Sequence, residues 1–508
     1  MSGKLVQGVA AALCALGLAA CGTSADPNAS AGNTTAIPMP SLPVSHNGRW
    51  LTDGDGRVVI FHGINVAMKE APYTPQAQGF TEEDAAMLAR EGFSTVRVWV
   101  FWNAIEPMPG VWDDSSLAAL REFVGWLRHY GITTTINFAQ VLWGEKFGGL
   151  GFPDWAAQTD GLPSTPPLAD GVTGLVLQGL LNPALNRAWS HFWANDPYPD
   201  NVGLQDHFAQ AWAHVAQYFR DVPGIVGYDI VNEPSPGAQG LTCLNPAGCP
   251  LFDLNTLTPF NERVVGAIRG VDPDHMIWYE PQVLAAAGFA TYVGAGDDPK
   301  LALTFHYYPQ TGSLGLGTAT DTAISLFEAD ASAHNDALLL SEFGASDDLP
   351  TIATLLDAAD QARLGWLYWA WYSTEPTGNA QTPTTEVDHP EEGIIIDPMQ
   401  APVEDNLKSD KLAVLGRPYP FLVAGTPQSW SFDTSSRTFS LSYSTVPVAG
   451  GAPITSPTVI IIPQRLYPQG SYQVSVTGAQ VTSAAGAPAL TLQTEQAAST
   501  VTVTVAPQ

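Results

Sequence analysis

The feature that most constrains this chain is a repeated alternation of short β-rich runs with longer helical stretches between residues 50 and 415. Parallel strands need crossover connections, usually helices, so this alternation is typical of an α/β fold. Eight strand–helix units predict a (β/α)8 barrel, also called a TIM barrel, over residues 46–415. The predicted strands are Val58–Asn65, Thr95–Val100, Thr133–Phe138, Ile225–Val231, Met276–Glu280, Leu301–His306, Ala337–Glu342 and Gly365–Trp371.

The stretches between these runs carry helical signals. One opens with the capping pattern Thr81-Glu82-Glu83-Asp84, and Leu117–Tyr130 is amphipathic at helical spacing. A doubly wound sheet is the alternative α/β fold. It is less favoured because no glycine-rich phosphate-binding turn follows the first predicted strand.

The pattern changes after residue 415. Short runs rich in Val, Thr, Tyr and Ser are separated there by Pro and Gly turns, without a helix-period segment. This pattern predicts a C-terminal, sandwich-like all-β domain over residues 416–508.

The N-terminus has the pattern of an export signal. Lys4 precedes an apolar run, Leu5–Ala20, that is too short to span a bilayer. The run ends in Leu18-Ala19-Ala20-Cys21, which looks like a bacterial lipobox, where the cysteine becomes the lipidated first residue. Ordinary cleavage, with Cys21 unmodified, is the alternative.

Residues 1–20 are therefore predicted to be a lipoprotein signal peptide. Residues 21–45, rich in Ala, Ser, Thr and Pro, are predicted to be a flexible tether. We expect the protein to be exported and held in the cell envelope or outside the cell by an N-terminal lipid anchor.

Cysteine usage fits export. Cys14 leaves with the signal peptide and Cys21 would carry lipid, so Cys243 and Cys249 remain as a pair in one short loop. A disulfide suits an oxidising compartment. Zinc is a poor alternative because no His or further Cys stands nearby at metal-ligand spacing.

The formal net charge is −29. A field of this sign repels nucleic-acid backbones, so nucleic acid is not an expected partner. Solubility alone can explain the acidic excess, which therefore does not identify a substrate.

Two carboxylates stand at predicted strand ends, where (β/α)8 barrels carry their reactive groups. The fourth strand runs into Asn232-Glu233-Pro234, and the seventh ends at Glu342. Two carboxylates across one barrel mouth are the equipment of glycoside hydrolysis, in which one protonates the leaving oxygen and the other attacks the anomeric carbon. Glu233 alone could equally be a solvated loop acid.

Several motifs around this pair give the chain a specific resemblance. It is similar to the retaining hydrolases of the four/seven (β/α)8 superfamily, and within them to the endoglycoceramidase-like branch of glycoside hydrolase family five. The motifs are Phe61-His62-Gly63-Ile64-Asn65-Val66-Ala67-Met68-Lys69, Val96-Arg97-Val98-Trp99, Ile105-Glu106-Pro107-Met108-Pro109-Gly110, the Cys243–Cys249 loop, Tyr279-Glu280-Pro281-Gln282, and Arg417-Pro418-Tyr419-Pro420 with Val423-Ala424-Gly425-Thr426-Pro427.

The resemblance implies a role for each matching residue. Glu233 would be the acid/base and Glu342 the nucleophile. The substrate-binding residues would be Asn232 on the sugar 2-hydroxyl, Arg97 and Tyr308 beside the nucleophile, His306 ordering the site, Lys69 on sugar hydroxyls, and Trp369, with Trp371 second, as a platform for the sugar ring.

Each of these supporting roles has an alternative. Arg97 could be a structural ion pair, His306 a core histidine and Lys69 a solvated cation. Any single Trp of the last strand could be core packing. Trp99, Trp102, Trp143 and Trp155 lie near the ends of the second and third predicted strands and could line the cleft.

The chain departs from the family pattern at one place. It reads Asn137-Phe138-Ala139-Gln140 where endoglycoceramidases typically show an acidic residue and a His before the Gln. Loss of a partner for a buried hydroxyl can change discrimination by orders of magnitude. The reaction type is unaffected by this departure, but the preferred sugar becomes an open question.

The sequence thus predicts an exported, lipid-anchored retaining β-glycosidase that cuts glycolipids at the sugar–aglycone bond by double displacement. An endo-β-glucanase or mannanase acting on polysaccharide is the alternative, and a non-catalytic carbohydrate-binding lipoprotein is a third possibility. The leaving-group side of the cleft would be apolar, with Leu177 and Leu284 as candidates. The mechanism needs no metal or other cofactor, and a monomer is expected.

Overall fold

A computed structural model of the chain describes residues 36–164, 177–309, 317–379 and 382–508. The predicted signal peptide, Cys21 and most of the predicted tether lie outside these residues. In the part of the chain that is described, no helix has the length and apolar content needed to cross a membrane.

Eight parallel strands close into a barrel, as predicted. Nearly every residue of these strands is buried, because the strands face the barrel interior on one side and helices on the other. The strands, in chain order, are β4 (His62–Val66), β5 (Thr95–Val100), β6 (Thr133–Phe138), β7 (Ile225–Asp229), β8 (Met276–Tyr279), β9 (Leu301–Tyr307), β10 (Ala337–Phe343) and β11 (Gly365–Tyr368).

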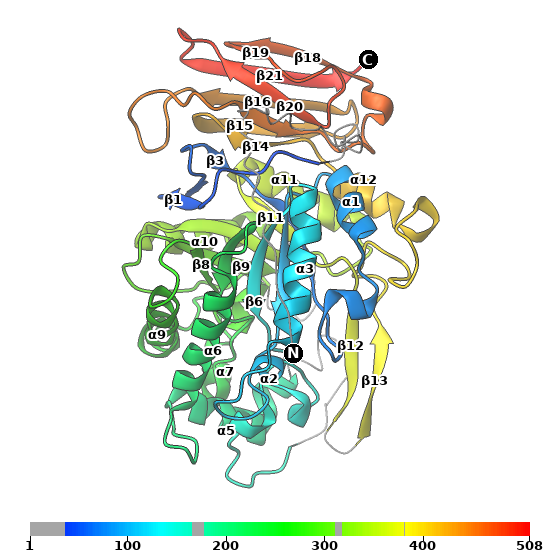
Figure 1. The fold of residues 1–508 in the computed structure, drawn as a ribbon. Coiled ribbons are helices and arrows are strands. Elements are labelled where there is room, and N and C mark those ends of the chain that lie inside the picture. Colours follow the sequence, from blue (N-terminus) through cyan, green and yellow to red (C-terminus); the bar gives the residue numbers. More distant parts are fainter. Residues whose placement is uncertain (1–35, 165–176, 310–316, 380–381) are drawn as a thin grey trace, which may run out of the picture. The chain divides into compact units, whose positions relative to one another are not determined.

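Amphipathic helices surround the barrel (Figure 1). The capping box predicted at Thr81 is present, with Asp84 accepting from the Thr81 N–H at 2.9 Å. The helices are α1 (Glu82–Arg90), α2 (Trp102–Ile105), α3 (Ser115–His129), α5 (Pro183–Trp193), α6 (Leu204–Phe219), α7 (Gly240–Cys243), α8 (Pro250–Phe252), α9 (Thr258–Arg269), α10 (Thr320–His334), α11 (Leu349–Ala362) and α12 (Ser409–Leu415).

Two antiparallel sheets form the C-terminal region. A four-stranded sheet contains β15 (Thr426–Asp433), β16 (Thr438–Ser444), β21 (Thr500–Pro507) and β18 (Tyr472–Thr477). A seven-stranded sheet contains β1 (Ser45–Asn47), β2 (Trp50–Thr52), β3 (Val58–Val59), β14 (Tyr419–Val423), β17 (Thr458–Ile461), β20 (Ala489–Thr494) and β19 (Ala479–Val481). A separate hairpin joins β12 (Thr374–Asn379) to β13 (Thr382–Asp388).

The seven-stranded sheet changes the predicted start of the barrel. The run Val58–Asn65 is divided: β3 pairs with β14 of the C-terminal region, and the barrel begins only at β4. Strands β1 to β3 begin at the boundary between the predicted tether and the predicted barrel range, and they belong to a sheet completed by the last part of the chain.

The C-terminal sheets contact the end of the barrel where its strands begin. His62, the first residue of β4, stacks between Trp366 and Tyr419, with ring centroids 4.2 and 3.7 Å away. Arg465 forms an ion pair with Glu91, just after α1, at 2.9 Å. In Figure 1 the C-terminal strands lie at one end of the barrel and α2, α5 and α7 at the other. The C-terminal sheets therefore do not cover the barrel mouth, which is formed where the strands end.

Candidate active site

Glu233 lies on a strained turn just beyond β7. Its backbone φ of +44° falls in the left-handed region that non-glycine residues rarely adopt. The turn is held from two sides, since Glu280 Oε2 accepts the Glu233 N–H at 2.9 Å and Gln140 Nε2 donates to the Glu233 carbonyl at 2.8 Å. Such strain persists only where surrounding contacts over-determine it, and it is concentrated at functional sites.

Glu342 lies at a β-bulge. The register between β10 and β9 shifts between Leu340 and Glu342, which leaves Ser341 as the extra residue. The Ser341 carbonyl is held by Asn65 Nδ2 at 2.9 Å. Because a bulge redirects the side chains around it, this irregularity sets the direction in which the Glu342 carboxylate points.

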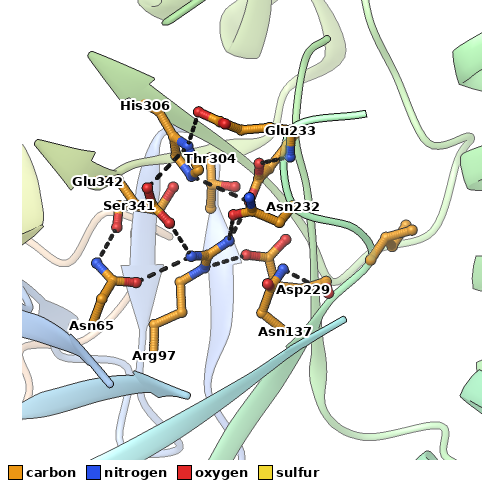
Figure 2. A network of polar contacts seen from close by, with 12 residues as sticks. Asn65, Arg97, Asn137, Asp229, Asn232, Glu233, Thr304, His306, Ser341 and Glu342 are labelled. Carbon is orange, nitrogen blue, oxygen red and sulfur yellow. Dashed lines mark hydrogen bonds and ion pairs between the residues drawn. The ribbon is translucent and has the colours of Figure 1, made fainter. Parts of the chain in front are cut away.

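Arg97 lies beneath both carboxylates and uses all five of its N–H donors (Figure 2). It is 1% exposed. The acceptors are Asp229 at 2.7 Å, Glu280 and Glu342 at 2.6 Å each, Asn232 at 3.0 Å and Asn65 at 3.1 Å. Arg97 thus stands beside Glu342 as predicted, and it is also the buried structural ion pair considered as its alternative.

His306 connects the two carboxylates that the sequence singled out. Its Nδ1 lies 2.8 Å from Glu233 Oε1 and 3.3 Å from Glu342 Oε2. One oxygen of each carboxylate and one His306 ring nitrogen all lie within 4.8 Å of one another. The two carboxylates are therefore as close as a retaining glycosidase requires, since inverting enzymes separate them by about 6.5–9.5 Å.

Tyr308 supports the same carboxylate from the other side. Its hydroxyl donates to Glu342 Oε2 at 2.9 Å. Burial and the Glu342 charge raise the pKa of Tyr308 well above its usual value, so the phenol stays a donor. Each Glu342 oxygen is therefore held, Oε1 by Arg97 and Oε2 by Tyr308.

Charge in the site is strongly coupled. Burial lowers the pKa of His306, but the carboxylates of Glu280 and Glu342 raise it well above its usual value. Burial raises the pKa of Glu280, but His306 and Arg97 lower it to about 2. These directions favour a His306 cation beside an ionised Glu280.

The other two buried acids respond mainly to desolvation. Burial raises the pKa of Glu342, and His306 and Arg97 oppose this rise. Burial and Glu280 raise the pKa of Asp229 well above its usual value, although Arg97 opposes them. Asp229 is the acid of this group that is best suited to keep a proton.

Lys69 and Trp369 lie together near the strand ends. Lys69 Nζ is 5.2 Å from the Trp369 ring and 5.8 Å from the Trp99 ring, and it donates to Ser373 at 3.3 Å. At 5% exposure Lys69 is not a solvated cation. Trp369 and Trp99 belong to an apolar cluster separate from the main core, whose other members are Ala67, Phe101, Ala139, Leu150 and Ala370.

The prediction that Trp371 is a second platform for the sugar ring is wrong. Its indole is fully buried, donates to Asp84 of α1 at 3.2 Å and packs on Phe80, with ring centroids 5.0 Å apart. Beyond the end of β11 the chain changes direction, so that the Trp371 side chain packs between the barrel and α1. It cannot serve as a sugar platform from there, and Trp102 and Trp143 are likewise fully buried.

Asn137 and Ala139, the two positions that depart from the family pattern, lie in different parts of the barrel. Asn137 is completely buried inside the barrel, where its Nδ2 donates to the Asp229 carbonyl at 3.3 Å. It therefore belongs to the support beneath Arg97, not to a sugar-facing surface. Ala139 lies in the apolar cluster of Trp369 and Trp99.

Asn232 is buried next to Glu233. Its Oδ1 accepts from Arg97 at 3.0 Å and its Nδ2 donates to the Gln140 carbonyl at 3.3 Å. The structure thus brings Asn232 to the site, while its contact with a sugar hydroxyl stays a prediction.

Sequence reasoning did not assign the contacts of Glu280, Asp229, Asn65 and Gln140. Glu280 could have been found, because it ends a predicted strand as Glu342 does. Asp229 is an acid within the apolar run Ile225–Val231, which is itself a signal of a paired interior charge. The backbone contacts of Asn65 and Gln140 depend on how neighbouring strands pair.

The predicted Cys243–Cys249 disulfide is present, with Cα atoms 4.7 Å apart. Its loop packs on the segment after β8, where the Ala290 N–H donates to the Pro246 carbonyl at 3.1 Å. That segment also reaches Glu233's neighbour, since Val283 N–H donates to the Pro234 carbonyl at 3.1 Å. The disulfide thus braces the loops beside the site.

Within the described ranges, the group with the spacing of metal ligands is Glu233, His306 and Glu342. A protonated histidine has no lone pair for a metal, and the carboxylates around His306 favour its protonated form.

Comparison with known proteins agrees with this geometry. The model of the family described as cellulase (glycosyl hydrolase family 5) matches residues 52–375, and that of the glycoside hydrolase family 5 C-terminal domain matches residues 417–505. Endoglycoceramidase I of Rhodococcus hoagii (strain 103S) is 31% identical over 90% of this chain and 86% of its own. Endoglycoceramidase of Hydra vulgaris is 27% identical over 84% of this chain and 82% of its own.

The solved structures lead in the same direction. Endo-glycoceramidase II from Rhodococcus sp., in its ganglioside GM3 complex, has a TM-score of 0.73 and 27% identity, and covers 90% of this chain and 99% of its own. The resemblance stated from the motifs is thereby confirmed. This chain belongs to glycoside hydrolase family 5, a family of retaining glycosidases.

Proposed function

We propose that this enzyme hydrolyses the β-glycosidic bond between the sugar and the lipid of a glycolipid, with Glu342 as nucleophile and Glu233 as acid/base. The observation that carries the proposal is the meeting of both carboxylates around His306 within 4.8 Å. That spacing suits direct attack by one carboxylate while the other protonates the leaving group.

In the first step Glu342 attacks the anomeric carbon, and Glu233 gives its proton to the departing oxygen. Arg97 and Tyr308 hold the two Glu342 oxygens, so the attacking group is oriented before substrate arrives. Glu233, whose side chain is 26% exposed, is the more accessible of the two carboxylates. The lipid alcohol leaves, and the sugar stays as an ester of Glu342.

In the second step Glu233 takes a proton from water, and the resulting hydroxide attacks the anomeric carbon. The ester to Glu342 breaks and the configuration is retained after two inversions. Esterification removes the negative charge of Glu342 from beside Glu233 while the proton is taken up. His306 contacts both carboxylates throughout, and therefore balances this exchange of charge.

The substrate class rests on the relatives, several of which are endoglycoceramidases aligned over most of both chains. Of the residues suggested for the lipid side, Leu284 is buried in the short helical turn Val283–Ala287 and Leu177 is half-buried. The rest of the segment suggested with Leu177, residues 171–176, lies outside the described residues.

The test is to incubate the enzyme with a glycosylceramide in detergent, an aryl β-glycoside and a soluble β-glucan, and to follow products and anomeric configuration. We expect cleavage of the glycolipid between sugar and ceramide, with retention and at a higher kcat/KM than for the glucan. Faster cleavage of the glucan would support the alternative function, an endo-β-glucanase or mannanase that acts on polysaccharide. Inversion would contradict the proposed roles of Glu233 and Glu342.

We also propose that the protein is exported, carries lipid on Cys21 and acts as a monomer. The Leu18-Ala19-Ala20-Cys21 motif and the Cys243–Cys249 disulfide support export, and one chain supplies every residue of the site described above. Wild-type protein should sediment with membranes, and Cys21→Ser should release it or leave it unprocessed. Soluble wild-type protein with a free N-terminus would contradict the anchor.

A further inference from the structure

A set of large apolar side chains is exposed on the loops beside the catalytic mouth. We call it the leucine surface: Leu181, Leu241, Leu251, Leu254 and Tyr292, which are 47, 63, 74, 53 and 39% exposed. These residues come from the segments that follow β6, β7 and β8. In this fold such segments lie at the mouth of the barrel.

Three contacts bring these segments together. The Cys243–Cys249 disulfide joins α7 to the start of α8, so Leu241 and Leu251 each stand two residues outside the bridge. Leu251 and Leu254 are three residues apart in continuous helical structure and therefore lie on one side of it. The Tyr292 N–H donates to Asp253 between them at 3.0 Å.

Leu181 adjoins the same region. A Cβ placed on Gly240 would lie only 2.8 Å from Leu180 Cδ2, so the end of the segment after β6 is packed against the start of α7. The leucine surface is therefore one neighbourhood and not five scattered side chains. Single exposed apolar residues are ordinary, whereas exposed apolar side chains gathered in one neighbourhood are typical of interaction sites.

The two segments that carry Leu241, Leu251, Leu254 and Tyr292 also lack exposed charge, in a chain whose net charge is −29. Between Glu233 and Glu262 the one charged residue is Asp253, which is fully buried and bound to Thr291 and Tyr292. Between Glu280 and Asp297 the sequence has no charged residue. Elsewhere the acidic excess would repel an anionic bilayer, whereas this face would not.

We propose that the leucine surface docks the enzyme on the surface of a lipid bilayer and so brings the mouth to substrate held there. The proposal deepens the proposed function, because a glycolipid with two hydrocarbon chains resides in a bilayer. Val283 N–H, on the segment that leads to Tyr292, bonds the carbonyl of Pro234 next to Glu233. Docking there would therefore place the lipid surface beside the acid/base.

The test compares the Leu251→Asp/Leu254→Asp double variant with Val446→Asp, a control at a residue that is 56% exposed in the C-terminal region. All proteins carry Cys21→Ser, so that an acyl chain makes no contribution. Binding is measured by sedimentation with phosphatidylcholine vesicles that contain no glycolipid. Turnover is measured on an aryl β-glycoside in buffer and on a glycosylceramide in the same vesicles.

We expect the double variant to lose vesicle binding and vesicle turnover at least tenfold, with aryl β-glycoside turnover within twofold of the parent. Val446→Asp should match the parent in all three. Unchanged vesicle binding by the double variant would overturn the proposal. An enzyme that binds vesicles through these leucines but cleaves no glycolipid, even in detergent, would instead contradict the proposed function and leave the docking surface in place.

Discussion

Asn137 and Asp229 stand opposite each other on neighbouring barrel strands, and each has one oxygen without a donor. They are register partners between β6 and β7, and both are completely buried. Among the described residues no donor reaches Oδ1 of either side chain. The Asn137 amide points at Asp229 in Figure 2. A proton on Asp229 would turn its unpaired oxygen into a donor.

We therefore expect Asp229→Asn, which mimics a protonated carboxyl, to keep kcat within about threefold of the wild type. Burial raises the pKa of Asp229 well above its usual value. An acid whose pKa is raised on folding stabilises the native state at low pH and loses this contribution as pH rises. The Tm of Asp229→Asn relative to wild type should therefore increase from pH 5 to pH 9.

The reciprocal variant is Asn137→Asp, which puts a second acid beside the first. Asn137→Asp should lower Tm. The difference in Tm from wild type should grow as pH rises, because the two buried carboxyls then lose the protons that keep them uncharged. If Asp229→Asn instead reduced kcat by several orders of magnitude without moving the pH profile, an ionised Asp229 would be required.

Glu342→Gln should abolish turnover of every substrate, because no other carboxylate on the described mouth is placed to form the covalent intermediate. Glu233→Gln should reduce turnover of a glycosylceramide by about 10²–10⁴-fold and have a much smaller effect on the first step with an aryl glycoside whose leaving group needs no proton. Rapid-quench measurement of the first turnover separates the two steps. The exposed Glu262→Gln is the matched control, and near wild-type rates in both active-site variants would refute their assignment.

Tyr308→Phe removes one of the two groups that hold Glu342. A hydrogen bond to a charged group is worth about 1.5–3 kcal/mol, so kcat should fall roughly 10- to 100-fold. Because the bond is made to the nucleophile, KM should change much less than kcat. Steady-state kinetics on an aryl β-glycoside would show this, and a rise in KM alone would point to sugar binding instead.

The charge on His306 predicts how stability depends on pH. The carboxylates around it raise its pKa well above its usual value. The stability that the His306 cation adds to the folded state is complete below pH of about 6.5, which is the pKa of an unfolded histidine. It declines as pH rises toward the folded-state pKa. The difference in free energy of unfolding between wild type and His306→Gln should therefore shrink between pH 6 and pH 9. A constant difference would contradict a His306 cation.

Trp430 tests the junction between the barrel and the C-terminal sheets. It is 4% exposed, and its indole donates to Asp360 of α11 at 2.8 Å. Trp430→Ala should lower the free energy of unfolding by about 3–5 kcal/mol. Turnover at 25 °C should be unchanged, because this contact lies away from the mouth. Ser431→Ala, exposed on the same strand, should have little effect on either measurement.

Periodicity and strand ends predicted most of the barrel and its two central carboxylates, because both depend on local pattern. Trp371 was beyond such reasoning: it follows Trp369 by two residues, but the chain has left the strand by then and the alternation of faces no longer applies. The strained φ of Glu233 and the bulge at Ser341 arise from contacts with other strands. The leucine surface depends on three segments meeting, which no single segment indicates.

Strands β3 and β14 pair with each other, although β3 is made early and β14 late in synthesis. Val58 and Val59 pair with Val423 and Leu422, and the whole barrel sequence lies between these partners. While the chain grows, β3 emerges early and presents an open strand edge until β14 follows. The barrel and its C-terminal sheets therefore become one folded unit only near the end of synthesis. A chain interrupted before residue 419 would retain Glu233, Glu342 and an unprotected strand edge, and we expect it to aggregate.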